Sequence, residues 1–188
     1  MSYALNTTKT IIAAVALAIL IPSTGMADNM QIDTTVNVYE RSSTGKLSAA
    51  ELGVHVTDNG TLVILHHDKY SQVGFLMRTK MVAKLEALFT KGAEWGATAK
   101  ESQVDIRKEI GTLVYNEKNK LTLTFVSCND GQAYYVVVEM EMGYKDATFV
   151  LEPGVPAEIM SRLHKAPEVK EKLGAAMAAK AEKSKLFN

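Results

Sequence analysis

The sequence predicts a single α+β domain: antiparallel meander sheets covered by a long amphipathic helix, followed by a C-terminal helix. In residues 77–103, apolar residues recur at alternating intervals of four and three, which is helix periodicity. On both sides of that stretch, apolar and polar residues alternate around turn-forming residues, as they do in strands. Residues 166–188 have a second helical pattern. Sheets whose helices are segregated to one side form the α+β class.

The long predicted helix is apolar on one face only. Its apolar positions are Met81, Leu85, Leu88, Gly92, Trp95 and Ala99, with Val82, Phe89 and Gly96 beside them. Lysines and glutamates take most of the other positions, so we expect that face to be in water. Because Trp95 is the only tryptophan and lies on the apolar face, we expect it to supply the largest buried surface between helix and sheet.

The first residues of the chain have the pattern of a cleavable secretory signal. Lys9 precedes an unbroken apolar run over residues 11–21, Pro22 ends the run, and Gly25-Met26-Ala27 provides small residues for a signal peptidase. The run is shorter than the roughly 20 apolar residues that cross a bilayer. We therefore expect residues 1–27 to be removed and residues 28–188 to form one domain in the periplasm or outside the cell.

Composition bounds the mature chain further. Its 161 residues, 188 minus 27, are enough for one domain with its own core. Cys128 is the only cysteine, so no intramolecular disulfide can form. The charge is 20 minus 21, or minus one, whereas a nucleic-acid binder is expected to have a clear basic excess. We expect no nucleic-acid partner and no membrane-spanning segment after cleavage.

The strands are predicted in chain order. Residues 32–38 alternate as a half-buried strand, and residues 41–50 are polar and small, as in a loop. Asn59-Gly60, between two β-rich runs, predicts a hairpin with a two-residue turn. In that register Val56 pairs with Val63, and Val54 with Leu65. Later strands are predicted around residues 112–115, 121–125, 134–142 and 147–151, a short helix at 156–164, and a last helix that begins near Pro167.

This order, strands and a long helix followed by four strands and a helix, resembles the topology of the Whirly and PUR-type single-strand nucleic-acid binders. The resemblance implies a fold with one strand-run-then-helix unit used twice. The export signal and the near-zero charge argue against the nucleic-acid binding that the resemblance would also imply.

Motifs that identify common enzyme classes are missing from the sequence. It has no Gly-x-Ser-x-Gly, no phosphate-binding glycine loop, no His-Glu-x-x-His and no Cys-x-x-Cys. No histidine lies close to Cys128 in sequence to act as the base that a reactive thiol needs, which favours an inert thiol, with a disulfide-linked dimer as the alternative. Glu139 and Glu141, two residues apart on one strand, are typical of a solvated face. We expect no cofactor.

One metal site is possible in the predicted hairpin register. There His66 lies diagonal to His55, and Asp68 continues on the same face. Two imidazoles and a carboxylate are ligands that zinc or copper uses. Against this, diagonal neighbours about 7 to 8 Å apart are at the limit of shared coordination. The metal site is therefore kept as an alternative.

Three functions remain compatible with the sequence. The first, which requires least of it, is an exported non-catalytic binding module for a protein or envelope component, of the inhibitor, immunity or exclusion type. Lys180, Lys183 and Lys185, near the end of the last helix, are its candidate binding residues. The second is a periplasmic metal-binding protein. The third is a hydrolase with an unrecognised site that involves His164 or Cys128.

Overall fold

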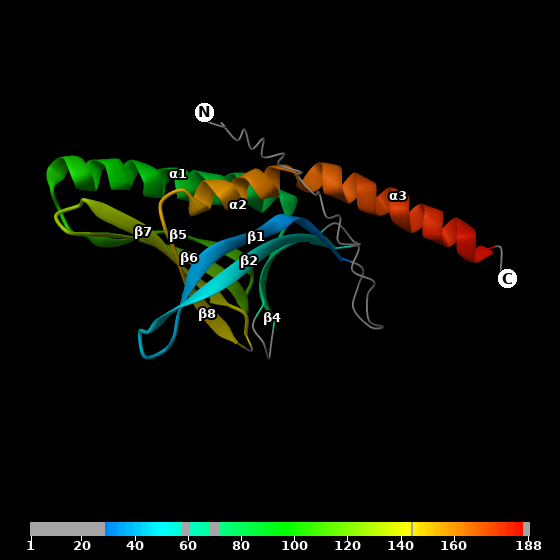
Figure 1. Ribbon diagram of the computed structural model, residues 1–188, viewed down its shortest axis with the longest axis horizontal. Coiled ribbons are helices and arrows are strands. Elements are labelled where there is room, and N and C mark those ends of the chain that lie inside the picture. The colour runs from blue at the N-terminus through cyan, green and yellow to red at the C-terminus, as the bar shows by residue number, and fades with distance from the viewer. Residues whose placement is uncertain (1–28, 58–60, 68–71, 144, 186–188) are drawn as a thin grey trace, which may run out of the picture.

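The computed structural model describes residues 29–57, 61–67, 72–143 and 145–185. Three helices lie along one side of a strongly twisted antiparallel sheet (Figure 1). In chain order the elements are β1 Asn29–Arg41, β2 Leu47–Thr57, β3 Leu62–His67, β4 Gln72–Met77, α1 Thr79–Ser102, β5 Arg107–Asn116, β6 Asn119–Cys128, β7 Ala133–Glu141, β8 Asp146–Leu151, α2 Val155–His164 and α3 Ala166–Lys185. The predicted α+β class is confirmed.

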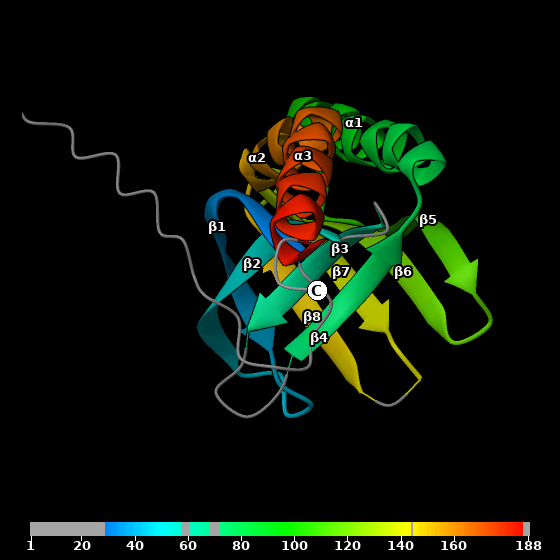
Figure 2. The ribbon, with the colours of Figure 1, turned by 90° about the vertical axis from the view of Figure 1, so that its right-hand side faces the viewer.

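The sheet consists of two four-stranded meanders joined at its centre. Its strand order is β4-β3-β2-β1-β8-β7-β6-β5, so each half pairs strands that are consecutive in the chain. The junction is short, because β1 and β8 pair only through Tyr39 with Val150 and Glu40 with Phe149. The sheet curls beneath the helices, as Figure 2 shows, and β4 comes into contact with β6.

The core fills the inside of this curl and is closed by the helices. Phe75, Phe125 and Phe149 from three strands are fully buried there. Residues of α1 that are buried against the sheet are Met81, Leu85, Phe89, Gly92, Gly96 and Ala99. At Gly96 a Cβ atom would lie 2.5 Å from the ring of Tyr134, so the absence of a side chain lets the helix approach β7 closely.

The predicted long helix is confirmed, but the middle of its buried face contains Phe89 and Gly96 rather than Leu88 and Trp95. Trp95 lies at the side of that face and is only partly buried. Its ring meets Phe125 edge to face, with centroids 5.9 Å apart, and the Nζ atoms of Lys91 and Lys108 lie 4.8 and 5.1 Å from its centroid. Trp95 thus packs against the core from beside the most buried row of α1 rather than from within it, and that it supplies the largest buried surface stays a prediction.

The predicted hairpin exists, but its register is wrong by one residue. Val56 pairs with Leu62 and Val54 with Ile64, not with Val63 and Leu65. The N–H of Thr57 donates to the carbonyl of Thr61, so three residues, not two, lie between the last paired positions. The one-residue shift moves every side chain of one strand to the opposite face relative to its predicted partner.

Two other boundaries also differ from the sequence prediction. The second strand begins at Leu47, inside the stretch predicted to be a loop, and pairs there with Arg41. The fourth strand, Gln72–Met77, was not predicted, and Met77 at its end is fully buried rather than the first residue of the helix.

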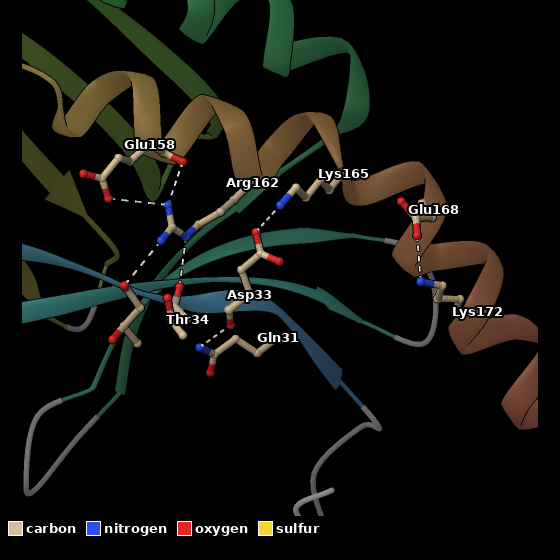
Figure 3. A network of polar contacts seen from close by, with 9 residues as sticks. Gln31, Asp33, Thr34, Glu158, Arg162, Lys165, Glu168 and Lys172 are labelled. Carbon is tan, nitrogen blue, oxygen red and sulfur yellow. Dashed lines mark hydrogen bonds and ion pairs between the residues drawn. The ribbon is translucent and has the colours of Figure 1, made fainter. Parts of the chain in front are cut away.

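An irregularity in β1 is held by α2. The pairing of β1 with β2 shifts between Ile32 and Val36, and Asp33 has a positive φ of 56°. The Nε of Arg162 donates to the carbonyl of Thr34 over 2.9 Å, and the Nζ of Lys165 lies 2.6 Å from Asp33 Oδ2 (Figure 3). Such a bulge leaves backbone acceptors of the ladder unpaired, and Arg162 supplies a donor to one of them, while Lys165 pairs with the Asp33 carboxylate.

The last helix is docked by its first turns only. Leu173 is buried, whereas every side chain from residue 174 to residue 183 is exposed, and α3 extends past the sheet in Figure 1. On its surface Lys172 donates a 2.6 Å hydrogen bond to Glu168. This hydrogen bond and the charge of Lys172 lower the pKa of Glu168, and Glu168 in turn raises the pKa of Lys172.

Candidate binding groove

An open groove extends from the face of the sheet that is turned away from the helices to the second half of α1, whose residues Ala93, Gly96, Ala97 and Lys100 also line it. We call it the outer groove; its volume is about 1070 Å³. It extends from the turn between β1 and β2, which projects away from the helices in Figure 1, to the turn between β6 and β7 beside the end of α1. Its lining includes Tyr39, Arg41, Leu47, Lys100, Arg107, Cys128, Tyr134, Tyr135, Val137, Val150 and Glu152.

The floor of the outer groove is apolar and lies at the junction of the two meanders. Val137 pairs with Val150, and Val150 pairs with Tyr39, so the three side chains share the outer face. Val137 and Val150 are buried, yet Tyr39 is 41% and Leu47 49% exposed. The groove thus presents two large apolar side chains to water on strands whose backbones are fixed by the sheet.

Among the charged side chains around this floor, basic ones outnumber acidic ones. Arg41, Lys100 and Arg107 line the groove, against the single carboxylate of Glu152. One nitrogen of Arg41 lies 3.6 Å from Glu139 Oε1 across the outer face. Tyrosine and arginine are over-represented at the centres of protein–protein interfaces. The composition of the groove therefore suits a polypeptide that carries acidic groups.

A smaller depression, the helix cleft, lies between α1 and α2 and has a volume of about 540 Å³. Four residues, Ala93, Tyr134, Glu152 and Pro153, line both the helix cleft and the outer groove, so the two are continuous. Glu86 Oε2 lies 3.3 Å from His164 Nε2 in the helix cleft.

The two histidines of the predicted metal site do not share a face. His55 pairs with Val63 and His66 with Leu52, so the imidazoles belong to opposite sides of the sheet. Asp68 lies outside the described residues. Within the described ranges no group of three or more histidine, cysteine, aspartate or glutamate residues is arranged to hold a metal ion. The prediction of a shared face failed because it depended on the two-residue turn.

Both histidines are buried. The ring of His55 lies over Gly53, where an added Cβ would be 2.7 Å from Nε2. On the inner face His66 is 3% exposed; its ring centroid is 5.0 Å from that of Phe149, and its Nε2 is 3.8 Å from Glu40 Oε2. These contacts place each ring in a packed environment of its own.

The residues named for a hydrolase are not brought together. Cys128 lines the outer groove, whereas His164 lines the helix cleft. Ser161 also lines the helix cleft, but no hydrogen bond joins it to His164 in the described part of the chain. Glu139 and Glu141 form ion pairs of 3.6 Å with Arg41 and Lys120, which matches the expected solvated face.

The lysines predicted to bind a partner lie on the far half of α3. The side chains of Lys180 and Lys183 are exposed. Lys185 is the last residue of α3, and its side chain lies outside the described residues. None of the three lines the outer groove or the helix cleft.

Sequence reasoning missed the outer groove. Tyr39 follows the strand predicted over residues 32–38, and Leu47 lies in the stretch 41–50 predicted to be a loop. Residues 47–51, Leu-Ser-Ala-Ala-Glu, show no alternation of apolar and polar residues that would have predicted a strand there. No signal in the sequence joins Tyr39 to Val150, because their pairing crosses between the two halves of the sheet.

No protein-family model matches the chain, and no curated protein does. None of the helices in the described ranges is long and apolar enough to cross a membrane. Among solved structures, SsgB of Streptomyces coelicolor is similar at a TM-score of 0.41 and 11% identity, covering 78% of this chain and 94% of that one. An SsgA-like sporulation-specific cell division protein from Thermobifida fusca has a TM-score of 0.38 at 12% identity, covering 86% and 98%. WHY3 from Arabidopsis thaliana has a TM-score of 0.30 at 9% identity, covering 88% and 99%.

Proposed function

We propose that this protein is an exported, non-catalytic binding module that recognises a protein of the periplasm or cell envelope through the outer groove. The observation that carries the proposal is the exposure of Tyr39 and Leu47 beside a buried apolar floor at the junction of the two meanders. Exposed apolar side chains with polar neighbours mark interaction sites. The export part of the proposal is supported by the apolar run and the Gly25-Met26-Ala27 site.

The charges of the groove favour an acidic partner segment. Arg41, Lys100 and Arg107 outnumber Glu152 along its walls. Positive groups at the rim of an interface act mainly on the rate of association and on its salt dependence. Binding through this groove should therefore weaken as salt is raised, while the apolar centre at Tyr39 and Leu47 supplies most of the affinity.

The experiment introduces a photo-crosslinking amino acid at Leu47 or, as the matched control, at Val114. Val114 is also a large exposed apolar residue on a strand, 56% exposed, but it lines neither the outer groove nor the helix cleft. After irradiation of exporting cells, we expect one envelope or periplasmic protein to be linked at position 47 and not at 114.

The linked protein is then purified and its affinity measured directly. Leu47→Asp and Tyr39→Ala should each weaken binding by about tenfold or more, the effect of losing an interface anchor, while Val114→Asp leaves the affinity unchanged. Equal effects at 47 and 114 would remove the outer groove from the proposal. Tighter binding of a single-stranded oligonucleotide than of any protein would replace the protein partner by a nucleic acid.

Export is tested separately by N-terminal sequencing of the protein recovered from the periplasmic fraction. The expected first residue is Asp28. Recovery of a chain that retains residues 1–27, or recovery in the cytoplasm alone, would contradict the location while leaving the groove untouched.

A further inference from the structure

The helix cleft has the size and lining of a small-molecule site. Its floor is formed by Phe89, Val136, Leu151 and Met160, all of which are buried. Its volume of about 540 Å³ lies within the range of about 300 to 1,000 Å³ that is common for ligand sites, and such sites occur between packed helices. Because these side chains are already buried, an apolar body placed there gains van der Waals contact with them and hides only its own surface from water.

The rim of the helix cleft is acidic. Glu86 from α1 and Glu152 from the end of β8 both line it and are exposed. No lysine or arginine is among the described residues that line the cleft, and His164 is the one lining residue that can carry a positive charge. Oε2 of Glu86 is the carboxylate oxygen that contacts His164. The second oxygen of an ionised carboxylate offers further acceptor positions for a ligand.

We propose that the helix cleft binds a small organic cation, a protonated amine attached to an aliphatic or aromatic body. The apolar floor accommodates the body, and the carboxylates of Glu86 and Glu152 face the ammonium group. The occupant is a free small molecule rather than a protein side chain, because the acidic rim and the buried apolar floor lie within one cavity of ligand size. An anion of the same shape would be repelled by both carboxylates.

The test is a titration of isotope-labelled protein, followed by amide chemical shifts. Benzylamine is the probe, and benzyl alcohol and benzoate are its neutral and anionic counterparts. Saturable shifts are expected at residues that line the helix cleft, such as Thr90 and Ala157. Benzylamine should bind about fivefold more tightly than benzyl alcohol, the effect of a modest exposed charge pair, and benzoate more weakly than either.

Two variants identify the groups responsible. Glu86→Gln combined with Glu152→Gln should reduce benzylamine binding to that of benzyl alcohol, while Glu168→Gln, an acid on α3 outside the cleft, should leave it unchanged. Ala157→Trp should fill the cleft and abolish binding of both compounds. Ala157 lines the helix cleft and not the outer groove, so partner capture at Leu47 should persist in this variant.

Three results would overturn the proposal: no saturable shifts with benzylamine, shifts scattered over the surface, or equal binding of benzoate. The peptide acetyl-Gly-Lys-Gly amide carries the same charge without a large apolar body. If it bound more tightly than benzylamine, the site would belong to a lysine of a protein partner instead.

Discussion

The guanidinium of Arg162 supplies the backbone carbonyl of Thr34 with the hydrogen-bond donor that a neighbouring strand would otherwise provide. Its Nε donates to that oxygen over 2.9 Å, while Nη1 donates to the carbonyl of Glu158 over 2.9 Å in its own helix (Figure 3). The Arg162 side chain is only 12% exposed, although Thr34 and Glu158, whose carbonyls accept from it, are exposed residues. One side chain thus fixes α2 to the bulge of β1, and α3 continues from that anchor.

The first prediction concerns this anchor. Arg162→Met keeps much of the packing but leaves the carbonyl of Thr34 without its donor, and should lower the free energy of unfolding by about 2 to 3 kcal/mol. Lys165→Met removes the neighbouring exposed pair with Asp33 and should cost less than about 1 kcal/mol. Urea denaturation of both variants measures the difference. Equal losses would show that the bulge, not the guanidinium, sets the position of α2.

The second prediction compares two aromatic residues in contact. Phe125→Ala removes a fully buried ring and should cost about 3 to 5 kcal/mol. Trp95→Ala removes a ring that is partly exposed and should cost less, about 1 to 3 kcal/mol. Denaturation midpoints of the two variants provide the comparison. A larger loss at Trp95 than at Phe125 would contradict this ranking.

The third prediction concerns His66. Its Nδ1 is buried and has no hydrogen-bond partner within the part of the chain that the structure describes. His66→Leu removes that cost of about 1 to 3 kcal/mol but also the edge contact with Phe149 and the 3.8 Å contact with Glu40, so stability at neutral pH should rise by about 1 kcal/mol. His164→Leu, at an exposed position, should change stability by less than about 0.5 kcal/mol. A clear loss of stability in His66→Leu would contradict this account.

The fourth prediction concerns α3. A chain that ends after Ala179 should melt within a few degrees of the full chain, because the side chains of residues 180–183 are exposed. Leu173→Ala should be more costly, by about 2 to 3 kcal/mol, since that side chain is buried. The truncated chain also tests Lys180, Lys183 and Lys185: weaker partner binding with an unchanged melting temperature would support their predicted role. Unfolding on truncation would place the end of α3 in the core.

The fold class followed from periodicity, but the hairpin register did not. The run from Leu62 to Leu65 is apolar at every position, so its alternation does not say which face is inward. The Asn-Gly pair favoured a two-residue turn, whereas the burial of Val54, Val56 and Ile64 on one face requires the register with three. Burial outweighed turn preference, and the predicted shared face of His55 and His66 failed with the register.

The position of Trp95 was missed for a related reason. Two apolar rows on this helix fit helix periodicity and differ by one residue: one contains Leu88 and Trp95, the other Phe89 and Gly96. What decides between them is the ring of Tyr134, which occupies the space beside Gly96. That contact joins residues from two elements that are far apart in the sequence. The outer groove and the helix cleft are likewise lined by residues from distant elements, so spacing along the chain predicts none of these three features.

The short junction between β1 and β8 has a consequence for how the chain folds. Within each meander every strand pairs with its sequence neighbour, so its contacts close small loops. Only Tyr39 with Val150 and Glu40 with Phe149 pair the first strand of the described chain with the last. Because contacts between distant segments form slowly, we expect each meander to form early and the junction to close last. The floor of the outer groove, which contains Val150 at that junction, would then be completed only in the final step of folding.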